Sequence, residues 1–188
     1  MRALPGDDLV PHASWVIDRQ LVLDASPAQV WPWLVQLGKD RGGWYLPHSV
    51  ERLLPVRRRG ARRILAQFQD VAVGDWMPDW GPGDPVLRVA VLRPEYALVY
   101  LSLRDRNDAH RWPAGDRLGP GVLAFSWALV LDGDAHRSAL HIRLRVAPTG
   151  QRSARAVRAL GGLLDWVTIA ALNRGLRERL AAGTGSPR

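Results

Sequence analysis

Five histidines are the side chains of this chain that could act as acids or bases near neutral pH or bind a metal ion. None of them lies in an H-E-x-x-H motif or pairs with another at metal-ligand spacing, and the chain has no cysteine. The sequence therefore predicts no metal site. His48 follows the aromatic pair Trp44-Tyr45 and is the one histidine to test as an acid or base, whereas His141 lies among arginines and is expected to be exposed. The five are His12, His48, His110, His136 and His141.

Aspartates beside a glycine turn are a second possible source of acid–base chemistry. Asp75 follows Gly74, and Asp70 lies a few residues earlier. Two carboxylates can act as acid and base when burial separates their pKa values, but Gly-Asp is also a common turn pair, and we favour the turn. Asp165, beside Trp166, is expected to face solvent. The chain has no G-x-S-x-G elbow and no G-x-x-x-x-G-K-[ST] loop, so the sequence assigns no catalytic residue and no cofactor.

Arginine dominates the charge of the chain. All but one of the 26 basic residues are arginine, the exception being Lys39, and the formal net charge is +8. Most of these arginines are scattered, which favours a solvated surface, and no nucleic-acid partner is expected. The cluster from Arg57 to Arg63 leaves an alternative open, namely anion or nucleic-acid binding, because guanidinium groups suit phosphate or a lipid headgroup.

The nine tryptophans are more than a domain of 188 residues usually needs to fill its core. They either fill the core and anchor turns, or several of them line a cavity whose rigid aromatic walls suit a flat or oily ligand. The aromatic residues that we predict to contact such a ligand are Trp33, Trp44, Tyr45, Trp76, Trp80, Tyr100, Trp127 and Trp166.

Alternating apolar and polar residues predict an antiparallel sheet with one covered face. Gly74-Asp75 also marks a turn into a strand. The longer expected strands are 16–23, 86–92, 97–103, 123–131 and 140–146.

Two helices of different length are expected beside the sheet. The first begins at Ser26, whose S-x-x-Q pattern is typical of a capping box, and stops at Gly38; Pro32 inside it predicts a kink or a short helix. The second spans residues 152–180 with an apolar stripe. It is the only expected helix long enough to cover the sheet.

These elements predict one domain over residues 1–188 of the α+β class, a curved antiparallel sheet wrapped around a long C-terminal helix. Residues 1–12 and 181–188 are expected to be flexible ends. Neither a signal peptide nor a spanning apolar stretch is expected, so the sequence favours a cytoplasmic protein without membrane insertion. It gives no indication of the oligomeric state.

Three segments resemble a bacterial subgroup of the START-like (SRPBCC) superfamily, which also includes Bet v 1-type proteins and polyketide cyclases/dehydratases. They are the V-W-P-W-L-V-Q-L-G and R-G-G-W-Y motifs at residues 30–38 and 41–45, and the segment 68–75. A weaker likeness covers residues 172–179. The resemblance implies the helix-grip fold, in which a cavity between sheet and helix binds lipids, polyketides or other hydrophobic molecules.

The resemblance does not imply one reaction, since fold and function are separate inferences. Our leading hypothesis is a binding or carrier protein for a hydrophobic small molecule, with no chemistry assigned. The alternative is an enzyme of the cyclase/dehydratase type that uses Asp75 or His48 as its acid or base.

Overall fold

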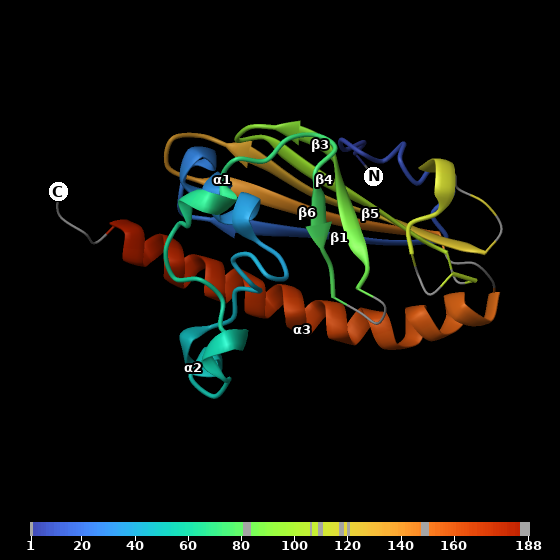
Figure 1. Cartoon of the computed structure of the whole chain (residues 1–188). Coiled ribbons are helices and arrows are strands. Elements are labelled where there is room, and N and C mark those ends of the chain that lie inside the picture. The colour runs from blue at the N-terminus through green and yellow to red at the C-terminus, as the bar shows by residue number, and fades with distance from the viewer. Residues whose placement is uncertain are drawn as a thin grey trace.

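The computed structural model shows a curved β-sheet with one long helix lying across it (Figure 1). The residues that it describes are 2–80, 84–105, 107–108, 111–116, 119, 121–147 and 151–184, with the backbone alone for 151–166 and 184. This is the expected α+β helix-grip architecture.

Six strands form the sheet in the order β1-β6-β5-β4-β3-β2, and every neighbouring pair is antiparallel. The register opposes Leu21 to Leu140 and Trp127 to Leu144. Because side chains alternate between the two faces of a strand, these pairs place the large apolar residues on one face. The bounds of the five longer strands agree with the expected ones within two residues. The strands are β1 Trp15–Leu23, β2 Trp76–Pro78, β3 Val86–Arg93, β4 Ala97–Asp105, β5 Val122–Gly133 and β6 Ser138–Ala147.

The long helix α3, Gln151–Thr184, covers that apolar face, as the sequence predicted (Figure 1). Its buried residues Ile169, Leu172 and Leu176 belong to the main core together with sheet residues of β1, β3, β4, β5 and β6. Each buried leucine or isoleucine stabilises the fold by roughly 1.5–3 kcal/mol, so this contact is a main source of stability.

The first helix, α1 (Pro27–Gln36), is capped as expected. The Ser26 hydroxyl accepts a hydrogen bond from the Gln29 N–H, and the Gln29 side chain accepts one from the Ser26 N–H. The helix has only ten residues and contains Pro32. Gly38 follows it with a φ of 143°, a conformation that side chains rarely adopt.

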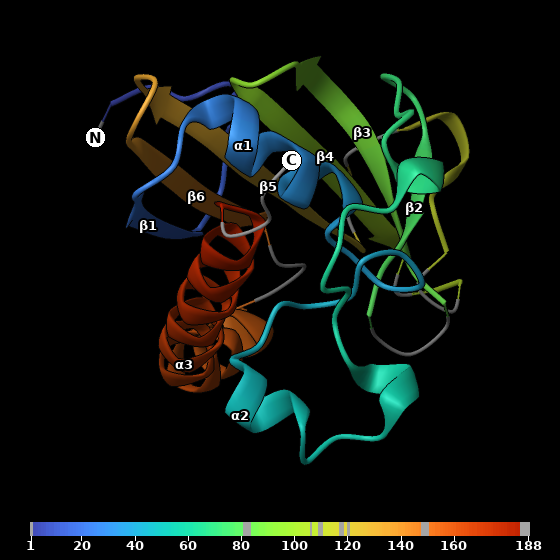
Figure 2. The ribbon, with the colours of Figure 1, turned by 90° about the vertical axis from the view of Figure 1, so that its left-hand side faces the viewer.

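A long insertion connects α1 to β2 on the same side of the sheet as α3 (Figure 2). It contains one turn of helix, α2 (His48–Glu51), and two 3-10 turns at Val56–Arg58 and Ala66–Phe68. The buried side chain of Gln36 ties the insertion to α1, because its amide oxygen accepts the Leu65 N–H and its amide nitrogen donates to the Arg63 carbonyl.

The outer face of the sheet is partly covered by the N-terminal segment, for which the sequence predicted a flexible end. Leu4 and Val10 are buried there, at 6% and 1% exposure. Arg143 of β6 is also buried, although the sequence favoured a solvated surface for most arginines, and it donates to the carboxylates of Asp7 and Asp18 and to the Arg2 carbonyl. Burial of a guanidinium needs such partners, and the first residues of the chain supply them.

One buried arginine joins the insertion to α3. The Arg179 guanidinium pairs with Glu51 of α2 at 2.6 Å and donates to the carbonyls of Leu46 and Ala61. It also lies 4.5 Å from the centre of the Tyr45 ring. Both charged side chains are almost wholly shielded from solvent, at 0% and 2% exposure. We refer to Tyr45, Leu46, Glu51, Ala61 and Arg179 as the Arg179 node.

The closeness of α3 to the node predicts an effect of Gly175→Ala. A Cβ at Gly175 would lie 2.5 Å from the Tyr45 carbonyl oxygen and 2.7 Å from the Leu46 carbonyl. Backbone has to shift to relieve this contact, so we expect the free energy of unfolding to fall by about 1–3 kcal/mol in urea denaturation, despite the better helix propensity of alanine.

Gly183→Ala is the matched control in the same helix, because no atom lies within 4 Å of its added Cβ. It is expected to leave stability unchanged or raise it by at most about 1 kcal/mol. Equal effects of the two substitutions would contradict the close packing of α3 on the insertion.

Candidate functional site

A cavity of about 230 Å³ lies between the sheet and α3. Its walls come from β1, β3, β5, β6, α3 and two loops, and most of them are apolar. Thr168 and Ile169 contribute the helix side, within the part of α3 whose side chains are described. We refer to this space as the inner cavity. Its lining residues are Ile17, Trp44, Asp79, Trp80, Leu87, Phe125, Trp127, Ile142, Leu144, Thr168 and Ile169.

The residues that form the sheet wall of the inner cavity share one face of the sheet because side chains alternate along each strand. Phe125 and Trp127 are two residues apart in β5, and Ile142 and Leu144 are two apart in β6. The pairing of Trp127 with Leu144 brings the two rows together on the face toward α3. The alternation that predicted the strands therefore also builds this wall.

The loop after α1 supplies Trp44. Gly43 has a φ of 73°, and a Cβ added to it would lie only 3.1 Å from the Cα of Gly60. The next residue but one, Tyr45, turns into the core and donates its hydroxyl to the Trp33 carbonyl at 2.9 Å. Neighbouring residues thus serve opposite purposes, with Tyr45 anchoring the loop and Trp44 lining the cavity.

A chain of aromatic rings runs from Trp80, which lines the inner cavity and is 45% exposed, to Tyr100 in the sheet. Trp80 contacts Trp44 edge-on with centroids 6.1 Å apart, and Trp44 stacks on Trp127 at 6.0 Å. Trp127 then stacks on Tyr100 at 5.7 Å. Such contacts hold large rings in fixed orientations and leave flat apolar faces for a guest.

The eight aromatic residues predicted from the sequence do not all meet. Trp44, Trp80 and Trp127 line the inner cavity, with Tyr100 buried behind Trp127. Trp33 and Tyr45 pack edge-on in the core. Trp76 contacts Trp112 instead and is half exposed, and the side chain of Trp166 lies outside the described residues.

An ion pair at the cavity wall was missed by the sequence analysis. Asp79 lines the inner cavity and pairs with Arg104, both side chains being largely shielded at 13% and 14% exposure. The Arg104 guanidinium also lies 4.9 Å from the centre of the Phe125 ring. Burial raises the pKa of Asp79, while the charge of Arg104 opposes that shift. Arg104 lies four residues after Tyr100 in β4 and therefore on the same face of the strand. This spacing is the feature of the sequence that could have placed Arg104 near the cavity.

The two residues considered as acid or base lie elsewhere. The Asp75 carboxylate accepts the Ala72 N–H at 2.8 Å, which is turn chemistry. The His48 side chain is exposed at the start of α2, and the backbone N–H of His48 donates to the Glu178 carboxylate. Neither side chain lines the inner cavity. The enzyme alternative therefore loses the residues on which it depended.

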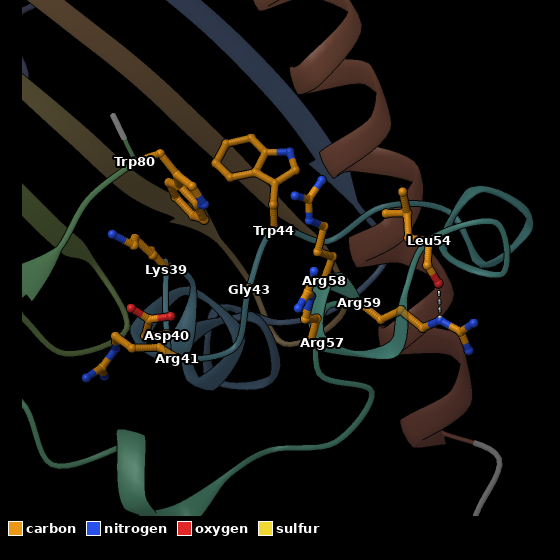
Figure 3. A pocket seen from close by; sticks show the side chains of 10 residues that line it. All are labelled: Lys39, Asp40, Arg41, Gly43, Trp44, Leu54, Arg57, Arg58, Arg59 and Trp80. Atoms are coloured by element: carbon orange, nitrogen blue, oxygen red, sulfur yellow. Dashed lines mark hydrogen bonds between the residues drawn. The ribbon is translucent and has the colours of Figure 1, made fainter. Parts of the chain in front are cut away.

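A second, more polar pocket of about 560 Å³ opens beside the first (Figure 3). Trp44 and Trp80 line both spaces. We refer to this one as the outer pocket. Its lining residues are Lys39, Asp40, Arg41, Gly43, Trp44, Leu54, Arg57, Arg58, Arg59 and Trp80.

The described residues contain no group of three or more histidine, cysteine, aspartate or glutamate side chains that could hold a metal ion. None of the helices described is long and apolar enough to cross a membrane.

Comparisons with known proteins find similar folds among solved structures. Protein MLL2253 from Mesorhizobium loti is 16% identical, with 88% of this chain and 98% of that chain covered and a TM-score of 0.48. Protein CV1439 from Chromobacterium violaceum is 14% identical, with 88% and 96% covered and a TM-score of 0.49. The Polyketide_cyc-like protein Cgl2372 from Corynebacterium glutamicum is 15% identical, with 89% and 87% covered and a TM-score of 0.39.

At such identities and TM-scores the likeness carries no argument about the family, function or ligand of this chain. No protein-family model and no curated protein matches the chain.

The raised pKa of Asp79 predicts a pH-dependent effect of Asp79→Asn. The folded protein keeps this proton at pH values where the unfolded chain has lost it, so the contribution of Asp79 to stability falls as the pH rises above about 4. Asparagine does not titrate. The free energy of unfolding of the variant, relative to wild type, should therefore increase as the pH rises above about 4 in urea denaturation series.

Asp116→Asn provides a control of opposite sign. Hydrogen bonds from Trp112 and Arg88 lower the pKa of Asp116, so this variant should lose relative stability as the pH rises through the range below about 4. A constant difference between Asp79→Asn and wild type over the whole range would contradict the burial of Asp79.

Proposed function

We propose that the chain binds a hydrophobic small molecule in the inner cavity and carries out no reaction on it. The observation that supports this most is the apolar space between sheet and α3, walled by the rings of Trp44, Phe125 and Trp127. Cavities lined by apolar and aromatic side chains with a few polar groups are typical ligand sites.

The polar lining supports binding rather than catalysis. Asp79 is the one ionisable residue among the described residues that line the inner cavity. Its carboxylate is already engaged by Arg104 and by the Trp80 N–H. The described lining contains no histidine, cysteine or second carboxylate beside Asp79. The residue pairs used in nucleophilic catalysis and in two-carboxylate acid–base catalysis are therefore not found among these lining residues.

The aromatic walls also favour a flat or ring-containing guest. Trp44 and Trp127 are stacked with an interplanar angle of 25°, and Trp80 stands edge-on to Trp44. Ring faces held in fixed orientations stack well against a planar apolar guest.

Filling the cavity from its wall tests the proposal. Leu144→Trp places an indole ring in the space that the ligand would occupy, while half-buried Leu144 leaves room for the fold to survive. The uncharged fluorescent probe N-phenyl-1-naphthylamine should bind wild type and bind the variant at least tenfold more weakly in a fluorescence titration. Native mass spectrometry of the purified protein should show any co-purified ligand in wild type only.

Leu53→Trp is the matched control, because Leu53 is 85% exposed and lies on the insertion rather than in the cavity. This variant should bind the probe as wild type does. The proposal fails if wild type binds neither this probe nor any molecule in a lipid and polyketide panel. It also fails if the two tryptophan variants bind equally, provided that circular dichroism shows both to be folded.

A further inference from the structure

The outer pocket has an excess of positive charge. Its described lining contains five basic side chains and one acidic side chain, Asp40. Two of the basic groups are already committed. Arg41 donates to the Val35 and Phe68 carbonyls, and Arg59 donates to the Leu54 and Arg52 carbonyls.

Three cations remain available at the pocket. Arg57 and Arg58 are exposed, and no hydrogen bond or ion pair of either side chain is found among the described residues. The Lys39 ammonium has one contact, at 3.3 Å, with Asp84, which is itself 98% exposed. An exposed pair of this kind is worth little, so it leaves Lys39 free to change partners.

The available cations adjoin the aromatic wall. Figure 3 shows Arg58 directed toward Trp44 and Lys39 beside Trp80, whereas Arg59 turns away to its hydrogen bond with Leu54. Because Trp44 and Trp80 line both spaces, the cations of the outer pocket adjoin the aromatic wall of the inner cavity.

Volume gives a second reason to connect the two spaces. The inner cavity, at about 230 Å³, is smaller than the roughly 300–1,000 Å³ of usual small-molecule sites. A ligand of ordinary size needs space beyond the inner cavity, and the adjoining outer pocket, at about 560 Å³, offers it.

We infer that the ligand is an amphipathic anion whose carboxylate, sulfonate or phosphate lies in the outer pocket against Arg57, Arg58 and Lys39, while its apolar part occupies the inner cavity. This inference rests on the proposed function and adds the chemical class of the ligand. Guanidinium forks bind such oxyanions through two parallel hydrogen bonds, which sets the direction in which the molecule enters.

The same observations disfavour a nucleic-acid surface. Of the arginine cluster predicted from the sequence, Arg59 is held by backbone carbonyls and Arg62 pairs with Glu51. Arg57 and Arg58 line the hollow beside two tryptophans, and Arg63 is exposed outside it, so only part of the cluster is available to a phosphate backbone.

Two probes with the same ring system test the inference. The first, 8-anilino-1-naphthalenesulfonate, carries one sulfonate, and N-phenyl-1-naphthylamine lacks it. In fluorescence titrations at low salt, wild type should bind the sulfonate more tightly. The double variant Arg57→Gln/Arg58→Gln should weaken sulfonate binding about tenfold and leave binding of the neutral probe unchanged.

The control Arg52→Gln/Arg63→Gln removes the same charge from exposed arginines of the same insertion that do not line the outer pocket. It should affect neither probe by more than about twofold. Salt should weaken binding of the sulfonate alone, because screening acts on its charge.

Three results would overturn the inference. The first is equal affinity of wild type for the two probes with no effect of Arg57→Gln/Arg58→Gln, in which case binding of the neutral probe still supports the proposed function. The second is calorimetric binding of inorganic phosphate as tight as that of the sulfonate probe and unchanged by Leu144→Trp, which indicates a site for a free anion. The third is displacement of the sulfonate probe by single-stranded DNA at stoichiometric concentration, which indicates a nucleic-acid surface. Failure of both probes contradicts the proposed function itself.

Discussion

The candidate site depends on the contacts of the buried Arg179 guanidinium, which join the insertion to α3. The guanidinium lies where water does not reach, and Glu51, three carbonyl oxygens and the face of Tyr45 surround it. Removing one partner of such a pair typically costs about 3–5 kcal/mol, because the other charge stays buried. These contacts hold the insertion against α3. Tyr45 takes part in them, and its neighbour Trp44 lines both the inner cavity and the outer pocket.

Much of the fold could be predicted from the sequence because its periodicities are local. The alternation along β6 and the apolar stripe of α3 each follow from a single element. The N-terminal segment differs, since its packing depends on a distant surface. Leu4 belongs to a buried cluster with residues of β4 and β5, among them Ala97 and Ala128, and no local pattern joins it to them. The guanidinium of Arg143, more than a hundred residues away in the chain, completes that contact with Asp7.

The candidate site was harder to predict than the fold. An excess of tryptophan indicated a cavity, but composition does not separate rings that line a space from rings that fill the core. Trp44 and Tyr45 are adjacent, yet one faces the cavity and the other is buried with Trp33. Asp79 was missed because its role depends on Arg104, a partner in β4 that lies 25 residues later in the chain. The motif residues of the R-G-G-W-Y loop and of the terminal helix mainly build the scaffold, with Gly175 and Arg179 contacting the loop directly.

The arginines of the cluster from Arg57 to Arg63 and Arg179 of α3 have different roles, because different hydrogen-bond acceptors lie near each guanidinium group. Arg179 has a carboxylate and carbonyls around it, and Arg59 and Arg62 also find partners. Arg57 and Arg58 find none among the described residues and remain at the pocket. Net charge therefore overstates how much of the surface could attract an anion. Arg57 and Arg58 belong to a small group of cations at the pocket that Trp44 lines, and Trp44 is the neighbour of Tyr45 in the Arg179 node. The ion pair of Arg179 with Glu51 therefore both stabilises the fold and helps to place Trp44 between the inner cavity and the cations of the outer pocket.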